Sequence, residues 1–225
     1  MNKAVIIVAG GSGSRMGGSI PKQFHLLNDI PILMHTMRRF FDYDDSLPIH
    51  LILPETEISS WQSLVDKYSF EIKHEVASGG ITRQHSVLNG LERLSREAVV
   101  AIHDGVRPLC SPLLIRRCFD TAEKFSNAIP AIKVTDSIRF TDEENSIALD
   151  REKVRLIQTP QCFDSVKLKR AYSKISESIF TDDAAVFEKD NHKIHLIDGE
   201  TSNIKITLPA DLELASYLEK KLFGS

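Results

Sequence analysis

The chain alternates short apolar runs with longer stretches in which apolar residues recur every three or four positions. The first run, residues 4–8, reads Ala-Val-Ile-Ile-Val, and similar, largely apolar runs stand at residues 49–53 and 99–102. Continuous β-branched runs of this length are typical of strands that are buried on both faces of a parallel sheet. The pattern therefore predicts buried strands at these three positions.

Between the runs, apolar residues follow the period of a helix with one buried face. Residues 55–68 show it most clearly, and we expect Trp61 to lie in the core. Further helices are predicted from Pro31 to about Asp44, around residues 87–91, and at 111–125, 165–176, 182–189 and 209–222. Further strands are predicted at 70–76, 128–134 and 194–197, and within a loop-and-strand segment at 199–207. This alternation predicts a three-layer α/β fold with a mostly parallel sheet and right-handed crossovers.

The pattern changes between residues 135 and 158. Short strands are predicted at 138–140 and 147–149, on either side of a polar turn at 142–145. An isolated two-stranded ribbon is only marginally stable unless something packs on it. We therefore predict a projecting β-hairpin that acts as a dimerisation arm, within a single domain that spans residues 1–225.

Composition narrows the range of partners. The chain has 225 residues, 42% of them apolar, and a formal net charge of −3, so it offers no global basic field for nucleic acid or an anionic membrane. Its first apolar run is too short for a signal peptide or a membrane span. Its cysteines, Cys110, Cys118 and Cys162, form no C-x-x-C pair and are expected to be core thiols, with a catalytic nucleophile as the alternative. We expect a cytoplasmic protein that binds neither nucleic acid nor membrane.

A glycine-rich stretch directly behind the first strand is the main candidate for chemistry. Residues 9–22 hold five of the chain's 11 glycines, together with Arg15 and Lys22. Glycine allows positive φ and close approach of the backbone, so that successive N–H groups can converge on an anion. Arg15 can bridge two phosphate oxygens with its planar guanidinium, whereas Lys22 acts as a point charge. The stretch therefore predicts a polyphosphate site.

Four kinds of loop compete for this stretch. A P-loop requires Gly-Lys-Ser/Thr, whereas Lys22 here is followed by Gln23. A dinucleotide fingerprint requires G-x-G-x-x-G and an acidic residue about 20 positions on, and this chain has one residue too many and no such acid. A nucleoside-triphosphate loop of the nucleotidyltransferase kind fits the spacing. A flexible surface turn with incidental cations is the remaining alternative.

Polar residues gather in two further loops that follow predicted strands, at residues 79–86 and 103–108. Ligands of such sheets sit beyond the carboxyl ends of the strands. Asp104 ends a buried strand, so it is the leading carboxylate for a Mg²⁺ ion that bridges triphosphate oxygens; the alternative is a cap for the helix that begins near Ser111. Arg151 and Lys205 suit a phosphorylated second substrate, although a solvated face is the default for any single surface cation.

Motifs extend along nearly the whole chain: residues 9–16, 21–24, Arg83 with 86–87, 103–108, 150–151, 159–161, 181–182 and 202–205. Taken together, they resemble the family of 2-C-methyl-D-erythritol 4-phosphate cytidylyltransferases of the non-mevalonate isoprenoid pathway. Most of these motifs are shared with ribitol-5-phosphate cytidylyltransferases, which are the nearest alternative, and residues 158–160 and 199–203 favour the first family. A non-catalytic nucleotide-binding module is a more remote alternative, and the presence of both Arg15 and Lys22 argues against it.

The resemblance implies a Rossmann-like, nucleotidyltransferase-type fold, a Mg²⁺-dependent reaction of CTP with the polyol phosphate, and a homodimer that exchanges its arms. It implies that Arg15 and Lys22 stabilise the transition state at the α-phosphate. Nucleotide contacts would come from Ala9, Gly10, Gly11, Gly13, Gly80, Arg83 and Ser86. The polyol phosphate would be held by Asp104, Arg107, Ser137, Lys205 and Thr181, with Arg151 and Thr159 reaching in from the partner subunit.

The chain departs from the family pattern at a few positions. Ile81 and Thr82 stand where many members have an acidic pair, so an acidic side-chain contact to the base from there is not expected. Gly105 and Val106 replace two small alanines, and Ser137 replaces a common threonine while keeping the hydroxyl. Thr181 and the acids after it also suit a helix N-terminus.

Overall fold

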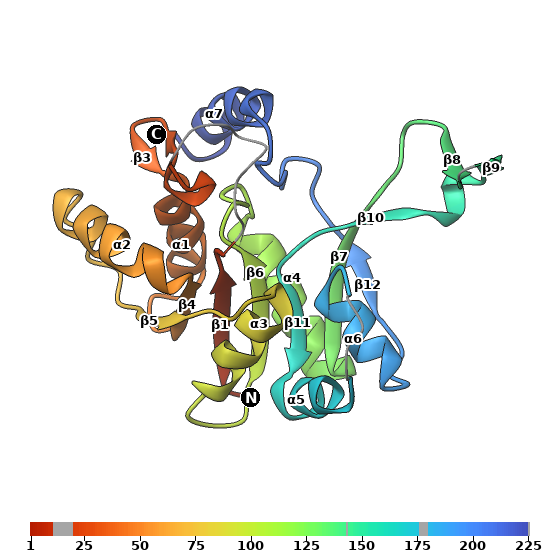
Figure 1. The fold of residues 1–225 in the computed structure, drawn as a ribbon, viewed down its shortest axis with the longest axis horizontal. Coiled ribbons are helices and arrows are strands. Elements are labelled where there is room, and N and C mark those ends of the chain that lie inside the picture. The colour runs from red at the N-terminus through yellow and green to blue at the C-terminus, as the bar shows by residue number, and fades with distance from the viewer. Residues whose placement is uncertain (11–19, 143, 176–179, 225) are drawn as a thin grey trace.

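A central sheet organises the fold of the computed structural model, which describes residues 1–10, 20–142, 144–175 and 180–224 (Figure 1). In the described part of the chain the sheet has eight strands: β1 (Lys3–Val8), β4 (Ile49–Leu53), β5 (Glu75–Ser78), β6 (Val99–Asp104), β7 (Asn127–Lys133), β10 (Arg155–Ile157), β11 (Gln161–Asp164) and β12 (Leu196–Asp198). Their order is β10-β7-β11-β6-β1-β4-β5, with β12 paired to β7.

The predicted apolar runs form the parallel centre of this sheet. β1 pairs in parallel with β4 and β6, and β4 with β5. The register places Val8 opposite both Ile52 and Asp104, so neighbouring strands end at one level. The chain leaves that edge at the start of the glycine-rich stretch and at the two polar loops. The sheet therefore brings together the described starts of the predicted site loops.

Helices cover both faces of the sheet and complete the three predicted layers (Figure 1). Alternate residues of β1 point to opposite faces: Val5 and Ile7 pack in one core cluster, Ile6 and Val8 in another. The first cluster is covered by α1 (Ile32–Tyr43), α2 (Glu55–Lys67) and α4 (Pro112–Phe125), and the second by α3 (Arg83–Glu92), α5 (Ser165–Lys174) and α6 (Asp183–Lys189). Trp61 and the three cysteines are buried and the thiols are free, as predicted for core residues.

The last helix, α7 (Pro209–Phe223), packs at the carboxyl edge of the sheet, not on a face. Its Ala215 joins a third, small cluster with Leu27, Ile32 and Val106. Leu27 belongs to a short hairpin of β2 (Leu26–Leu27) and β3 (Ile30–Pro31), directly after the 3₁₀ turn η2 (Lys22–Phe24). The helix therefore packs on the segment that follows Lys22.

Three local predictions were wrong. The strand predicted at 70–76 is confined to β5, because the preceding residues turn Phe70 and His74 toward Trp61. Residues 199–207 form no strand, because their polar groups bond to other loops. β11, which the sequence pattern missed, runs antiparallel between β6 and β7; with four residues it is too short to show a period.

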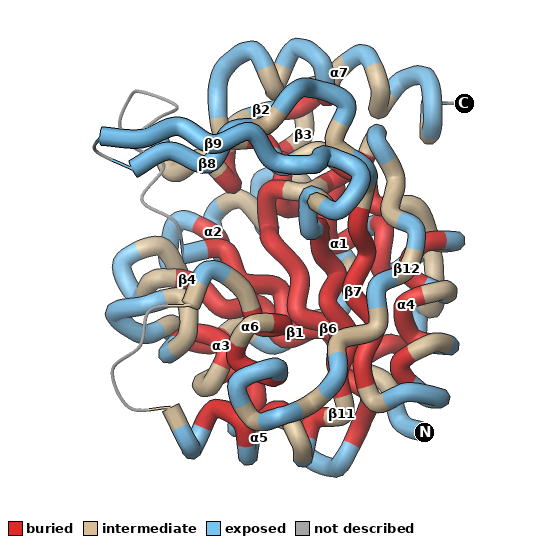
Figure 2. Tube along the Cα trace, turned by 90° about the vertical axis from the view of Figure 1, so that its right-hand side faces the viewer, coloured by how far each residue is buried: buried red, intermediate tan, exposed pale blue. Residues whose placement is uncertain are grey.

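The predicted hairpin is present and projects from the body (Figure 1). β8 (Ile138–Thr141) and β9 (Ser146–Leu149) pair only with each other among the described strands. Almost every residue of the two strands is exposed, including Phe140 and Ile147, as the pale tube in Figure 2 shows. This exposure is the expected state of an arm seen in a single chain. No helix in the described residues is long and apolar enough to cross a membrane.

Candidate functional site

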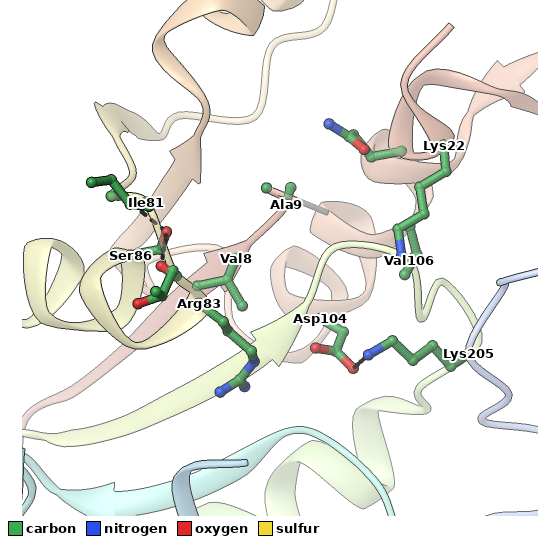
Figure 3. A pocket seen from close by; sticks show the side chains of 13 residues that line it. Val8, Ala9, Lys22, Ile81, Arg83, Ser86, Asp104, Val106 and Lys205 are labelled. Carbon is green, nitrogen blue, oxygen red and sulfur yellow. Dashed lines mark hydrogen bonds and ion pairs between the residues drawn. The ribbon is translucent and has the colours of Figure 1, made fainter. Parts of the chain in front are cut away.

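A cavity of about 230 Å³ opens at the carboxyl ends of β1 and β6 (Figure 3). Lys22 approaches it from one side and Ser86 and Arg83 from the other, with Ala9 between them. The predicted site residues that line it are Ala9, Gly10, Lys22, Gly80, Arg83, Ser86, Asp104 and Lys205. We call this space the first cavity; it contains most of the predicted nucleotide contacts.

A second cavity of about 240 Å³ adjoins the first. Arg83, Asp104 and Lys205 line both cavities, so these three charged residues form the junction between them. The second cavity is lined in addition by the predicted substrate contacts Arg107, Thr159 and Thr181. The residues predicted for two different substrates therefore fall into two adjoining spaces.

Asp104 links the cations of the junction. Its Oδ2 lies 3.0 Å from Lys205 Nζ and 3.2 Å from Arg107 Nε, and the first of these contacts is drawn in Figure 3. Burial on its own would raise the pKa of Asp104, but the positive charges of Lys205, Arg83 and Arg107 outweigh it and hold the pKa well below its usual range. Asp104 is therefore a carboxylate at neutral pH and keeps Lys205 at the junction.

A chain of hydrogen bonds fixes the end of β6. The Asp104 N–H donates to Thr159 Oγ1 (3.1 Å), and this hydroxyl lies 3.1 Å from His103 Nδ1. His103 Nε2 lies 3.1 Å from the Arg107 carbonyl, which can only accept, so Nε2 carries the proton and Nδ1 accepts from Thr159. Burial lowers the pKa of His103 to about 4, so the ring is neutral at physiological pH. This geometry corrects the expectation that Thr159 reaches in from a partner, because the hydroxyl is buried beside the Asp104 of its own chain.

The loop that carries Lys205 is held by buried amide side chains. Asn203 is fully buried and donates from Nδ2 to the Thr159 carbonyl (2.9 Å). Gln158 Nε2 donates to the Glu200 carbonyl (2.7 Å), and Arg107 Nη1 donates to the Asn203 carbonyl (2.8 Å). These bonds replace a strand ladder and place Lys205 opposite Asp104. The motif at 202–205 indicated the loop, but the sequence alone did not single out Gln158 or Asn203.

Arg83 is tied to the second half of the chain. Its Nη2 lies 2.6 Å from Asp183 Oδ2, and the Tyr172 hydroxyl donates to Asp183 Oδ1 at 2.6 Å. Burial on its own would lower the pKa of Arg83, but the Asp183 carboxylate outweighs burial and holds the pKa above its usual value. For residues 181–184 the sequence predicted a substrate contact at Thr181 and a helix start, and Asp182 does cap α6. Asp183 and Tyr172 lie on different helices, so no local pattern predicted that they position Arg83.

The second glycine loop is closely packed. The Gly80 N–H donates to Ser86 Oγ (3.1 Å), whose hydroxyl donates to the Thr82 carbonyl (3.0 Å). A Cβ at Gly80 would stand 2.2 Å from His85 Cβ, so no other residue fits there without rearrangement. Ile81 is 99% exposed. Many members of the family that the sequence resembles have an acidic residue at this position. The loop therefore offers backbone and Ser86 groups to a ligand.

Some predicted site residues are not brought into either cavity. Arg15, Gly11 and Gly13 lie outside the described residues. Arg151 lies at the base of the arm in the 3₁₀ turn η3 (Arg151–Lys153), where its Nη1 donates to the Thr135 carbonyl (2.6 Å). Ser137 is exposed between β7 and β8. In a single chain, neither Arg151 nor Ser137 lines a cavity with the other site residues.

Comparison with known proteins gives a consistent result. A family model described as 2-C-methyl-D-erythritol 4-phosphate cytidylyltransferase matches residues 3–220. A protein of that name from Azobacteroides pseudotrichonymphae is 47% identical over 219 residues, covering 96% of this chain and 98% of its own. The protein of the same name from Bacteroides thetaiotaomicron is 43% identical over 218 residues, covering 97% of this chain and all of its own.

Solved structures with the same fold carry equivalent names. The 4-diphosphocytidyl-2C-methyl-D-erythritol synthase of Anaerococcus prevotii superimposes with a TM-score of 0.83 at 29% identity, covering 97% of this chain and 98% of that one. The 2-C-methyl-D-erythritol 4-phosphate cytidylyltransferase of Thermus thermophilus gives a TM-score of 0.79 at 29% identity, covering 98% and 100%. The likeness in fold therefore extends over nearly the whole chain.

Proposed function

The chain belongs to the 2-C-methyl-D-erythritol 4-phosphate cytidylyltransferase family, and we propose that it joins CTP to 2-C-methyl-D-erythritol 4-phosphate. A phosphate oxygen of the polyol phosphate attacks the α-phosphorus of CTP. The bond between the α-phosphorus and the bridging oxygen breaks, and pyrophosphate leaves with the electron pair. The observation that carries this proposal is the junction at Arg83, Asp104 and Lys205, where two cavities meet.

CTP fits the first cavity. Its wall at Ala9 and Gly10 offers backbone groups to the nucleotide, and Gly80 and Ser86 lie on the side proposed for the base. A triphosphate carries roughly four negative charges near neutral pH, and more charge builds on its oxygens during attack. Lys22 lines this cavity and supplies a positive charge for them. Arg15 is proposed to act beside it, as the sequence predicts.

The polyol phosphate fits the second cavity. Arg107 offers a guanidinium for its phosphate, and Thr159 and Thr181 add polar groups to the wall. Lys205 lies between the two cavities, held by Asp104 at 3.0 Å. A cation at this place can balance the charge of the attacking phosphate as it approaches the α-phosphate. Positioning and charge stabilisation can supply most of the rate, so no protein nucleophile is required.

Mg²⁺ is the proposed cofactor. Asp104 is the only carboxylate that lines the first cavity in the described part of the chain, and both of its cation contacts use Oδ2. One available carboxylate oxygen fits an ion that keeps several waters and is bound chiefly through nucleotide phosphates. When bound, Mg²⁺ supplies charge neutralisation on those phosphates. Asp104 is the residue that would hold it.

A homodimer with exchanged arms is proposed for the assembly. The arm presents apolar Phe140, Ile147 and Leu149 to solvent, although an isolated hairpin is marginally stable. Arg151, at its base, lies outside both cavities of its own chain. A second copy that covers the arm would bury these side chains and bring Arg151 to a neighbouring site. The buried free thiols suit the reducing cytoplasm that we propose as the compartment.

Pyrophosphate release tests the proposed reaction. The purified chain is incubated with CTP, MgCl₂ and either 2-C-methyl-D-erythritol 4-phosphate or ribitol 5-phosphate, and pyrophosphate is followed with a coupled assay. We expect release with methylerythritol phosphate and little with ribitol 5-phosphate. Release with ribitol 5-phosphate alone would contradict the substrate, and release with neither acceptor would contradict the activity. Omission of Mg²⁺ is expected to stop turnover.

A further inference from the structure

Lys22 lies in a short turn whose two ends serve different parts of the molecule. Lys22 begins η2 and lines the first cavity, whereas Phe24, at the other end, is 6% exposed and belongs to the core. The turn is closed by bonds from Phe24 N to Pro21 O (2.9 Å) and from His25 N to Lys22 O (3.3 Å). A single turn has little stability of its own. Its orientation therefore depends on what Phe24 packs against.

Phe24 stacks on Trp61, the only tryptophan in the sequence. The two ring centroids are 6.1 Å apart and the planes differ by 15°, an offset parallel arrangement. Trp61 is fully buried in α2, and Phe70 contacts it nearly edge-on at 5.9 Å and 71°. Trp61 lines neither cavity. Its stack on Phe24 therefore links Trp61 to the turn that carries Lys22.

His74 fixes the rotation of the indole ring. The His74 Nδ1 lies 2.7 Å from the Ile72 carbonyl, which can only accept, so Nδ1 carries the proton. The other nitrogen, Nε2, then accepts the Trp61 Nε1–H at 3.0 Å. Burial lowers the pKa of His74, so the ring stays neutral and this acceptor is present at neutral pH. The irregular backbone before β5, where the sequence predicted a strand, is what allows this contact.

We propose that Trp61, held by His74, is a positioning residue for Lys22. The stack on Phe24 keeps the turn in the orientation that directs the Lys22 ammonium into the first cavity. Misplacement of a reacting group by about 1 Å can cost on the order of 10²-fold in rate, so a looser turn reduces turnover without unfolding the chain. The inference rests on the proposed function only for the identity of the nucleotide and the reaction that is assayed.

Kinetics of Phe24→Leu test the proposal against a matched control, Phe119→Leu. Phe119 is also buried, stacks on Tyr43 at 5.5 Å, and lines neither cavity. Both variants are expected to lower Tm by similar amounts. Only Phe24→Leu is expected to lower kcat, by about tenfold, with the KM for the polyol phosphate within about twofold. An unchanged kcat in Phe24→Leu, or an equal loss in both variants, would overturn the proposal.

A double-mutant cycle on CTP binding asks whether the effect passes through Lys22. CTP with Mg²⁺ is titrated calorimetrically, without acceptor, into wild type, Phe24→Leu, Lys22→Ala and the double variant. Phe24→Leu is expected to weaken binding several-fold in the wild-type background and to have no further effect when Lys22 is alanine. Equal losses in both backgrounds, or none in either, would overturn the proposal.

Two variants of His74 test whether its hydrogen bond to Trp61 matters. His74→Phe keeps a ring but removes the acceptor, and is expected to reproduce part of the loss of Phe24→Leu in kcat. His74→Gln offers a side-chain carbonyl as hydrogen-bond acceptor and is expected to recover the lost kcat; a loss equal to that of His74→Phe would contradict the role of the hydrogen bond.

The binding cycle is measured without polyol phosphate, so it tests the positioning proposal separately from the proposed function. A wild-type chain that binds CTP but does not convert methylerythritol phosphate would contradict the proposed function and leave the binding cycle interpretable.

Discussion

The cations of the sheet body and the cation of the arm are held in different ways. Lys205 contacts Asp104 and Arg83 contacts Asp183. The side chains of these two carboxylates are at most 11% exposed. Arg151 has a side chain that is 51% exposed, and its contacts are a backbone carbonyl and the exposed Glu152. The body therefore fixes its cations within one chain. In the described part of the chain, Arg151 lines neither of the two cavities.

This difference indicates which parts of the site are preorganised. A buried carboxylate holds a cation in one geometry, whereas exposed ion pairs contribute little and leave long side chains mobile. We expect substitutions in the body to affect the reaction in every subunit that carries them. We expect a substitution at Arg151 to affect the site of the partner. The predictions below test this distinction, beginning with the largest expected effect.

Loss of a cation at the junction or in the first cavity is expected to have the largest effect. Lys22→Ala and Lys205→Ala should each lower kcat/KM by about 10³-fold, because each removes a charge that stabilises the transition state. Circular dichroism should show unchanged secondary structure. Steady-state pyrophosphate release measures the effect, and a near-normal kcat in Lys22→Ala would rule out its proposed role.

Arg151→Ala is expected to have the next largest effect, with a different signature. It should raise the KM for the polyol phosphate and lower kcat/KM by about 10²-fold, because a charge-assisted phosphate contact is lost. The KM for CTP and the Tm should stay unchanged, since Arg151 is exposed in its own chain. The control is Lys153→Ala, which removes another cation of the same turn and leaves Arg151 in place. In this variant the KM for the polyol phosphate and the KM for CTP should both match wild type. A change in the CTP constant would contradict the proposed placement.

Asp183→Asn should have a smaller effect on turnover. The change weakens the anchor of Arg83 and should lower kcat/KM by about tenfold, in keeping with the loss of a charge-assisted hydrogen bond. Tyr172→Phe leaves the carboxylate in place and should cost only about 1 kcal/mol of unfolding free energy with near-normal kcat. Urea unfolding alongside kinetics separates the two effects. A normal kcat/KM in Asp183→Asn would show that Arg83 needs no anchor.

The smallest effect at neutral pH is expected for His103, whose contribution to the free energy of unfolding changes only as the pH falls. The pKa of His103 is about 4 in the folded chain against 6.5 in its unperturbed state, so the unfolded chain binds the extra proton first as pH falls. The contribution of His103 is fully present above pH 6.5 and is lost toward pH 4, by up to about 1.4 kcal/mol per pH unit. His103→Gln should flatten this part of the profile in urea unfolding. Identical slopes in wild type and variant would contradict a neutral buried His103.

How much the sequence predicted depended on the range of the interactions. Buried parallel strands carry their own signal in continuous apolar runs, so β1, β4 and β6 were predicted correctly. The exposed hairpin was also predicted correctly, from two short strands on either side of a polar turn. The irregular segment before β5 was not predicted, because His74 there accepts a hydrogen bond from the indole of Trp61 and does not pair with a neighbouring strand. Tertiary contacts of this kind override local propensity.

The site shows the same limit. Asp104 and Lys205 were predicted individually from a strand end and a motif, but their ion pair joins residues far apart in sequence. Asp183, Tyr172 and Asn203 were missed as positioning residues because each acts through a partner on another element. Spacing along the chain carries no information about such pairs. Only the folded sheet edge brings them together.

Complementation in mixed dimers tests most directly the claim that body and arm supply one site from two chains. Arg151→Ala and Lys205→Ala are each expected to have little activity alone at a polyol phosphate concentration below the KM of the Arg151→Ala variant, where the assay is run. The two variants are unfolded, mixed and refolded together. If the arms are exchanged, each heterodimer contains one intact site, and a 1:1 mixture should recover about a quarter of wild-type activity, as expected for random pairing in a twofold dimer. Activity that stays at the level of the single variants would contradict the exchanged arm and the shared site.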